Sequence, residues 1–250
     1  GAPLAAPLRG AGYILVKICD KKESVFVEQN KLLQIARDGA AKYNAEQFEV
    51  LKRMVNTDSG SRDAEGVNKV AAIVEEVLST LPGIQIEKFV TEEYGTNLVA
   101  RITPPDPTGK IVINSHLDTV YQKGDCEKFP FRIEGDTMYG LGIVDCKGGF
   151  VVSAYAVKIM QEAGLLPNKE IVMIYSCDEE ICSPSSRPVF EKVASDAEMA
   201  FIFESSREDN GALTSRKGSY GIELQVTGRK SHAGVNYLAG ASATMELAHK

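Results

Sequence analysis

Apolar positions in the first third of the chain recur at the spacing of helices. They predict a weakly amphipathic helix over 25–43, and Asn44 with Gln47 three residues later is typical of a cap that begins a second helix. Asp63 is expected to cap a third helix that stops at Pro82-Gly83. The apolar faces of the second and third helices are formed by Phe48, Leu51 and Val55, and by Val67, Val70, Val74, Val77, Leu78 and Leu81.

From residue 84 onward the pattern becomes that of strands separated by helices. Ile84 and Ile86 alternate with polar residues, as in a half-buried strand. Further strands are predicted over 97–102, 111–113, 170–175, 199–203 and 220–226, with a hairpin formed by 131–133 and 137–139. Helices are predicted over 148–163 and 188–194 and from about Gly240. This alternation favours an α/β fold, a layered helix–sheet–helix domain with buried strands at its centre.

Composition excludes several classes of protein. The 250 residues are 44% hydrophobic and 25% charged, which is ordinary for a globular protein, and the formal net charge is −6 without a basic cluster. Nucleic acid is therefore not an expected partner. A membrane span is not expected either, since no apolar run reaches the roughly 20 residues that a spanning helix needs. Residues 13–19, interrupted by Lys17, are too short for a signal-peptide core and are interpreted as a strand or loop.

The cysteines bear on the cellular compartment. There are five, an odd number, and no two are arranged as C-x-x-C. A disulfide framework is therefore not expected, and a reducing, cytoplasmic compartment is favoured over an oxidising one.

Possible metal ligands follow directly after three of the predicted strands. They are His116 and Asp118, Glu179 and Glu180, and Glu204. In open α/β sheets ligands bind beyond the carboxyl ends of the strands, so these side chains are expected to meet at one edge of the sheet. Asp118 lies on the same side as His116 in an extended chain and is placed to support it by hydrogen bonding.

A fourth candidate, Asp145, precedes Lys147-Gly148-Gly149 at the start of a predicted helix, and its carboxylate is suited to bridging two metal ions. Each candidate also has an ordinary structural interpretation. A single His at a strand end is usually not a ligand, adjacent acids usually form a solvated loop, and an Asp before a helix can be its cap. Together, the His, Asp and Glu residues predict a mixed nitrogen and oxygen site suited to zinc.

The same residues lie in five ordered motifs. These are Ser115-His116-Leu117-Asp118-Thr119-Val120, Gly140-Leu141-Gly142-Ile143-Val144-Asp145-Cys146-Lys147-Gly148-Gly149, Asp178-Glu179-Glu180, Phe203-Glu204 and Ser231-His232-Ala233-Gly234. From about Glu46 to its end, the chain resembles the zinc aminoacylase/carboxypeptidase family. The segments 56–66 and 118–131 resemble in particular the glutamate carboxypeptidases of the carboxypeptidase G type.

The resemblance implies a role for each of the site residues. His116 would bind one zinc ion together with Glu204, Asp145 would bridge both ions, and Glu180 would bind the second. Glu179 would be the general base, taking a proton from water and passing it to the leaving amine. Asp118 would orient His116. The peptide bond that follows Asp145 is cis in relatives and is expected to be cis here.

The resemblance also implies a domain organisation. A zinc-dependent catalytic domain over residues 1–214 would be followed by 215–250, the start of an inserted α+β lid and dimerisation domain. His232 would stabilise the oxyanion in the active site of a partner subunit; the alternative is a polar residue in a turn. The expected partners are a small-molecule or peptide substrate with a free carboxylate and a second copy of the chain, bound through the lid.

Some residues depart from the family pattern. The family needs a further zinc-binding histidine near its C-terminus and an arginine for the substrate carboxylate, and His249 is a poor candidate for the former. The chain is therefore expected to be a fragment or to lack a complete site. Ile181-Cys182-Ser183-Pro184 replaces a Gly-Ser turn, and Ser205-Ser206 replaces Pro-Thr after Glu204. Cys146, Cys177 and Cys182 are interpreted as buried apolar fillers, with an oxidation-sensitive site as the alternative.

Three functions remain open from the sequence. The first is a di-zinc hydrolase that cleaves the amide bond of N-acyl or peptidyl amino acids and releases C-terminal glutamate. The second is an N-acyl amino acid deacylase or dipeptidase with the same chemistry. The third is a non-catalytic dimerising scaffold. Relatives of the glutamate-specific type are sometimes exported, so a periplasmic or otherwise exported location stays open beside the cytoplasmic one.

Overall fold

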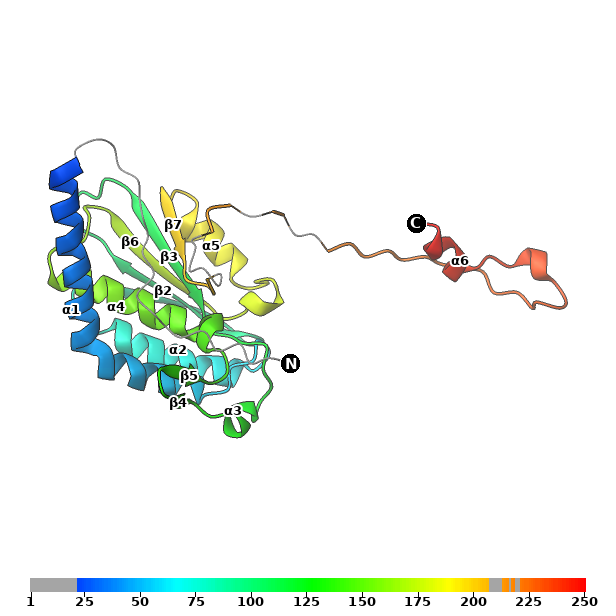
Figure 1. Ribbon diagram of the computed structural model, residues 1–250. Helices are drawn as coiled ribbons and strands as arrows, with labels where there is room; N and C mark the ends of the chain where they lie inside the picture. The colour runs from blue at the N-terminus through cyan, green and yellow to red at the C-terminus, as the bar shows by residue number, and fades with distance from the viewer. Residues whose placement is uncertain (1–21, 207–212, 216, 219–220) are drawn as a thin grey trace. The chain divides into compact units, whose positions relative to one another are not determined.

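The computed structural model describes residues 22–206, 213–215, 217–218 and 221–250, the side chains of 22–28 excepted (Figure 1). The chain divides into two compact units, Gly1–Gly211 and Ala212–Lys250. The predicted strand or loop over 13–19 lies outside the described residues. Among the described residues, no helix combines the length and the apolar character that crossing a membrane requires.

A five-stranded sheet forms the centre of the first unit. Its strands, in spatial order, are β1 (Gln85–Thr91), β2 (Gly95–Ile102), β6 (Glu170–Ser176), β3 (Lys110–His116) and β7 (Met199–Ile202). Strands β6, β3 and β7 run parallel, whereas β2 pairs antiparallel with both β1 and β6. The carboxyl ends of the three parallel strands therefore lie at one edge of the sheet, as the sequence predicts.

Helices cover both faces of this sheet, which confirms the predicted α/β layering (Figure 1). On one face lie α1 (Lys22–Val55), α2 (Ala64–Leu78) and α4 (Gly148–Glu162), and on the other lies α5 (Arg187–Ala194). The larger core packs the apolar faces of the first three helices against the sheet. The smaller core packs Val189 and Val193 of α5 against valines and an isoleucine of β2, β3 and β6.

Shorter elements connect these layers. They are α3 (Asp125–Lys128), the hairpin of β4 (Arg132–Glu134) and β5 (Thr137–Tyr139), a wide helical turn at Ile143–Lys147 and a tight 3-10 turn at Glu179–Ile181. Asp63 caps α2 as predicted, since its side chain accepts a hydrogen bond from the backbone N–H of Gly66. The predicted hairpin is likewise confirmed.

The predicted break at Asn44 is wrong, because α1 continues through this residue to Val55. Contacts with α4 hold the helix on both sides of Asn44. Before it, Tyr43 packs against Tyr155, with ring centroids 5.6 Å apart, and after it the Tyr155 hydroxyl donates to Glu46 at 2.8 Å. Packing against a neighbouring helix therefore outweighs the capping preference of Asn44.

Two predicted strands differ from expectation. Strand β7 exists, but Met199 and Ile202 are 53% and 62% exposed, because β7 pairs only with β3 among the described residues and forms an edge of the sheet. Residues 221–226, predicted as part of a strand, form none. Their alternating pattern is strand-like, but an extended segment needs a hydrogen-bonding partner, and none lies in the described part of the chain.

The second unit contains a few local elements. The bridge between Arg229 and Ala241 closes a loop around the 3-10 turn Tyr237–Ala239. Helix α6 (Ala243–Ala248) follows, near the position predicted from Gly240, and the Ser242 hydroxyl caps it by accepting from the Met245 N–H at 3.2 Å.

Strand β2, in the interior of the sheet, provides a test of this packing. Leu98 is fully buried in the larger core, so Leu98→Ala is expected to lower the free energy of unfolding by about 2–5 kcal/mol through the cavity it leaves. Val90 on β1 is 68% exposed, and Val90→Ala should change the same quantity by less than about 0.5 kcal/mol. Urea denaturation followed by circular dichroism measures both; equal losses would contradict the layering.

Candidate metal centre

His116 is the last residue of β3, and its imidazole is buried at the carboxyl edge of the sheet. Its Nδ1 lies 2.9 Å from the backbone carbonyl oxygen of Asp118, which can only accept a hydrogen bond. Nδ1 therefore carries a proton, and Nε2, on the other side of the ring, is the nitrogen that can bind a metal ion. This tautomer suits a metal-ligating histidine.

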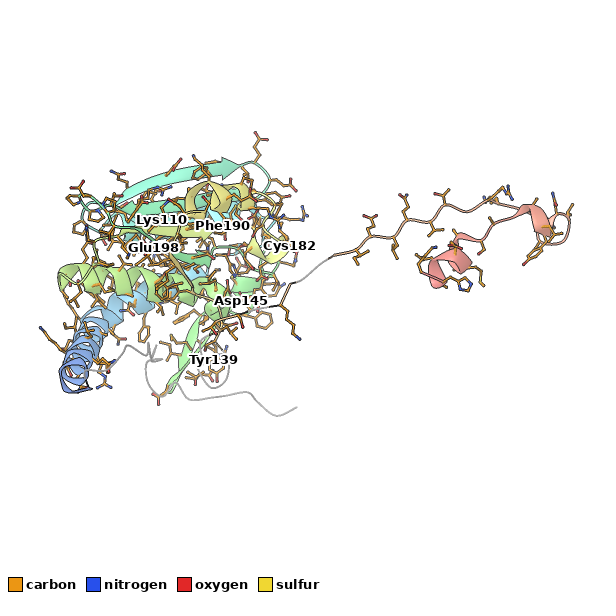
Figure 2. All side chains as sticks on the ribbon, turned by 90° about the horizontal axis from the view of Figure 1, so that it is seen from above. Lys110, Tyr139, Asp145, Cys182, Phe190 and Glu198 are labelled. Carbon is orange, nitrogen blue, oxygen red and sulfur yellow. The ribbon has the colours of Figure 1, made fainter. Side chains whose placement is uncertain are left out.

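Carboxylates from three other segments surround Nε2. The nearest oxygen of Asp145 lies 2.9 Å away, that of Glu204 3.6 Å and that of Glu179 3.9 Å. Asp145 comes from the turn before α4, Glu204 follows β7, and Glu179 follows β6. Figure 2 shows Asp145 and Cys182 towards the opposite end of the sheet from Lys110 and Glu198, which lie where β3 and β7 begin.

The electrostatics of this cluster favour a bound cation. Burial would lower the pKa of His116, but hydrogen bonds to Asp118, Cys146 and Glu204 raise it above its ordinary value. Burial also raises the pKa of Glu179, and the carboxylate of Glu204 adds to the rise. So many acids around one imidazole nitrogen require a compensating positive charge, which either a proton or a metal ion supplies. The donor set, imidazole and carboxylate, fits a divalent ion such as zinc.

Asp118 connects the cluster to the loop that follows β6. Its buried carboxylate accepts hydrogen bonds from the Ser61 hydroxyl at 2.7 Å and from the backbone N–H groups of Glu179 and Glu180 at 3.1 and 3.2 Å. One of its oxygens also lies 3.4 Å from Nδ1 of His116. Asp118 therefore positions the two consecutive glutamates as well as the histidine that the sequence pairs it with.

Glycines allow the backbone segments of the cluster to approach closely. A Cβ atom on Gly149 would lie 2.0 Å from the backbone oxygen of Phe203, the residue before Glu204. Gly142 has a φ of 72°, in the left-handed region that glycine tolerates best. These contacts place the start of α4 directly against the end of β7. The peptide bond between Asp145 and Cys146 is cis, as the family resemblance implies.

Two residues next to Asp145 take on roles that sequence reasoning did not assign. Lys147 is buried, and its Nζ donates to the backbone oxygens of Met54 and Thr57, each at 2.9 Å, which ties the turn to the C-terminal end of α1. Burial lowers the pKa of Lys147 to about 8. Cys146 Sγ belongs to a group of donor atoms, with His116, Asp145 and Glu204, that all lie within 4.8 Å of one another. For both residues the signal in the sequence was their place within two positions of the candidate ligand Asp145, and for Cys146 the sequence had left an oxidation-sensitive site open beside the filler interpretation.

The remaining predicted site residues are placed as follows. Burial raises the pKa of Glu180, and the negative charge of Asp145 raises it further. Glu180 therefore lies close to the cluster. Glu180 also borders a cavity of about 550 Å³ formed with the loops 60–63 and 119–123. His232 belongs to the second unit, where it is exposed and its Nδ1 accepts from the Gly234 N–H at 3.1 Å.

The loop that departs from the family pattern adopts an unusual backbone. Cys182 and Ser183 have φ values of 69° and 57°, a conformation in which glycine is the least strained residue. The loop is held by Asp178, whose buried carboxylate accepts from the Ser186 hydroxyl at 2.6 Å and from backbone N–H groups of Ser185 and Ser186. Cys182 is exposed, so the interpretation of this cysteine as a buried filler is wrong, while Cys146 and Cys177 are buried.

Comparisons with known proteins agree on one family. Residues 112–249 match the family described as peptidase family M20/M25/M40. Carboxypeptidase G2 of Pseudomonas sp. (strain RS-16) is 34% identical over 203 residues, which are 80% of this chain and 48% of that protein. Succinyl-diaminopimelate desuccinylase of Corynebacterium glutamicum is 27% identical over 130 residues, 51% of this chain and 32% of that protein. The chain thus spans less than half the length of these relatives.

Solved structures share the fold. Human carnosine dipeptidase 1 has a TM-score of 0.60 at 18% identity, over 70% of this chain and 42% of that chain. A metallo-carboxypeptidase of the M20 family from Sulfolobus solfataricus has a TM-score of 0.55 at 21% identity, over 64% of this chain and 38% of that chain. At such low identity the likeness concerns the fold alone.

Replacement of Asp118 tests its positioning role. Asp118→Asn keeps the shape but turns an N–H donor towards backbone N–H groups, and should lower the free energy of unfolding by about 1–3 kcal/mol at neutral pH. Asp106→Asn, on an exposed loop, is the matched control and should change little.

The difference in the free energy of unfolding between the wild-type protein and Asp118→Asn should depend on pH, as the pKa of Asp118 indicates. Burial alone would raise that pKa, but hydrogen bonds from His116 and Ser61 hold it below its ordinary value. The stabilisation is therefore complete above the ordinary carboxyl pKa of about 4 and is lost as pH falls through the lower folded-state value. Denaturation curves of both proteins from neutral to acid pH measure this. A gap that widens towards low pH would contradict the proposed hydrogen bonding.

Proposed function

The chain belongs to peptidase family M20/M25/M40, and on this premise we propose that its donor group binds metal for the hydrolysis of an amide bond. In the intact protein two zinc ions would be bound, and the substrate would be an N-acyl or peptidyl amino acid. Release of a C-terminal glutamate is the most specific form of this proposal. It is supported by the 34% identity with carboxypeptidase G2, the protein with the highest identity among those compared above.

One observation carries the proposal. Carboxylate oxygens from three separate segments lie within 3.9 Å of Nε2 of His116. The other ring nitrogen, Nδ1, is hydrogen-bonded to a backbone carbonyl. If these carboxylates had only a structural role, neither a metal ion nor a permanently charged side chain would compensate their negative charge. A divalent ion is the natural counter-charge for such a donor set.

The proposed ligands divide between two ions. His116 and Glu204 would bind the first, Glu180 would bind the second, and Asp145 would bridge them, since its carboxylate lies against His116 and raises the pKa of Glu180. When bound, the ions would supply electrophilic activation of the scissile carbonyl and of the attacking water. His232 and His249 lie in the second unit, and a role for His232 at a partner subunit's active site remains a proposal.

Glu179 is the proposed general base. Its carboxylate is partly exposed, lies 3.9 Å from His116 Nε2, and is not needed for any hydrogen bond that holds the loop, because its backbone N–H serves that purpose. It would accept a proton from the attacking water and deliver it to the nitrogen as the C–N bond breaks. Burial and the neighbouring acids raise the pKa of Glu179, which suits a group that must both take and give a proton.

The cavity beside Glu180 is the proposed place for part of the substrate. Its wall includes Val120, Tyr121 and Ile181, with the cations Arg62 and Lys123 among the lining residues. The volume of about 550 Å³ is within the range of small-molecule sites. Arg62 and Lys123 pair with Glu93 and Glu65 at 2.9 and 3.2 Å, so the apolar part of the wall is the feature that suits the acyl group or side chain of an acylated amino acid.

A deacylase or dipeptidase is the second candidate, and the 27% identity with the succinyl-diaminopimelate desuccinylase named above favours the deacylase. Hydrolysis rates with N-acyl-glutamate, N-succinyl-amino acid and dipeptide substrates separate the possibilities. A protein without metal and without turnover on the whole panel would instead be the non-catalytic dimerising scaffold.

Glu179→Gln is the direct test of the mechanism. It removes the base while keeping the size of the side chain, and kcat should fall by about 10²–10⁴-fold with KM little changed. The metal content, measured by mass spectrometry, should stay at the wild-type value. Removal of metal by a chelator should abolish turnover in both proteins.

A matched control is Glu127→Gln, an exposed glutamate in the short helix α3. It should retain full turnover and full metal content. Wild-type turnover in Glu179→Gln would exclude this residue as the base. Metal-free wild-type protein with unchanged turnover would contradict the metal-dependent mechanism altogether.

A further inference from the structure

The helix α3 begins without a cap of its own. Its N-cap residue, Gly124, has a φ of 90° and no side chain that could accept a hydrogen bond from the first turn. With four residues, α3 is also far shorter than a helix that is stable in isolation. Another part of the chain therefore has to hold its first turn in place.

Asp58, in the segment between α1 and α2, acts as this cap. Its carboxylate accepts hydrogen bonds from the backbone N–H groups of Gly124 at 2.7 Å and of Cys126 at 3.1 Å. Burial alone would raise the pKa of Asp58, but hydrogen bonds from Gly124 and Cys126 lower it below its ordinary value. Asp58 is therefore ionised at neutral pH, and a carboxylate at the first turn of a helix binds its free N–H groups and complements its dipole.

The loop that leads into α3 forms part of the wall of the cavity beside Glu180. Residues 119–123 line this cavity together with 60–63. At its beginning, the backbone of Thr119 is hydrogen-bonded to Ser59 and Ser61 at 2.8 and 3.2 Å. At its end the loop is held by Asp58, so the lining residues lie between two attachments to the same segment, 58–61.

A further contact of this loop is weaker than the one made by Asp58. Lys123 pairs with Glu65 at 3.2 Å, but their side chains are 68% and 65% exposed, and exposed pairs contribute little to stability. Asp58 is partly buried and binds backbone groups, whose loss would leave the first turn of α3 without acceptors. Asp58 is therefore the stronger constraint on the end of the loop.

The donor group is positioned by other residues. Asp118 positions His116 and the loop after β6, and Lys147 ties the turn before α4 to the end of α1. The ammonium group of Lys147 also contributes to lowering the pKa of Asp58, so the metal content of any Asp58 variant has to be measured as well. Loss of Asp58 is expected to change the cavity wall and to leave the metal ligands in place.

We propose that Asp58 is a positioning residue for substrate binding, which fixes the wall formed by 119–123 against the acyl group or side chain of the substrate. The inference rests on the proposed function in placing part of the substrate in this cavity. A loop that adopts the binding conformation for only part of the time lowers the apparent affinity in proportion to that fraction. Asp58 therefore affects KM and leaves the chemical step unchanged.

Kinetics of the intact protein with N-benzoyl-glutamate, whose acyl group is apolar, measure this separation. Asp58→Asn retains one oxygen acceptor and Asp58→Ala retains none, so KM should rise by about threefold and by about tenfold, with kcat within about twofold of wild type. The metal content should stay at the wild-type value in both. Asp106→Asn, on an exposed loop, is the matched control and should leave KM unchanged.

Gly124 allows the same test from the loop itself, even if Asp58→Ala does not fold. Its φ of 90° strains any residue with a Cβ, although no heavy atom beyond its chain neighbours lies within 4 Å of that Cβ position. Gly124→Ala should therefore also raise KM, by about threefold or more. Gly83→Ala is the matched control, because Gly83 has a φ of 73° and equally open surroundings but lies between α2 and β1.

A tryptophan on the wall reports the loop without any turnover. The chain contains no tryptophan, so Tyr121→Trp introduces a single fluorophore into it at a position that lines the cavity. Adding Asp58→Ala to this variant should increase the quenching of its fluorescence by acrylamide, because the loop is released. Adding Asp106→Asn should leave the quenching unchanged.

Each outcome bears on one part of the inference. Unchanged quenching after loss of Asp58 would overturn it, since the loop would then not depend on this carboxylate. Increased quenching with unchanged KM, or loss of metal and kcat in Asp58→Asn, would overturn it too, and would leave the proposed function standing. Wild-type protein without turnover would contradict the proposed function itself and, with it, the role of the wall in binding substrate.

Discussion

The buried carboxylate of Asp118 is the interaction on which the site depends. It joins the end of β3 to the loop after β6 through two backbone N–H groups, and to the segment before α2 through Ser61. Backbone hydrogen bonds join the same segments, from Ser61 to Thr119, from Thr119 to Ser59 and from Leu117 to Ser176, and the carboxylate adds a side-chain anchor to them. The carboxylate is shielded from water, so these hydrogen bonds are stronger, and their loss more costly, than at the surface.

Close backbone contacts also hold the segments of the site together. Gly149 allows the start of α4 to touch the end of β7, and Gly60 allows its loop to approach the backbone of Tyr121. Lys147 binds the carbonyl groups at the end of α1 with a buried ammonium group. A donor group assembled in this way is positioned by backbone and core contacts of the segments that carry it.

The acids of the site oppose one another. Burial and the surrounding carboxylates raise the pKa values of Glu179 and Glu180, whereas the charge of His116 lowers both. A divalent ion would relieve this repulsion, so metal binding and folding are expected to stabilise each other. The shared fold of remote M20 structures, at 18–21% identity, is consistent with a scaffold that tolerates sequence change as long as the strand ends remain in place.

Local signals in the sequence determined much of this protein. The cap at Asp63, the hairpin at 131–139 and the acids and histidine after apolar strands depend on residues close together in the chain, which periodicity and turn chemistry report. Only the tertiary structure decided the continuity of α1 through Asn44, the exposure of β7 at an edge, and the position of Cys146 beside His116. Each of these depends on which distant segment a residue meets, and a hydrophobic pattern records that a residue is buried without recording its partner.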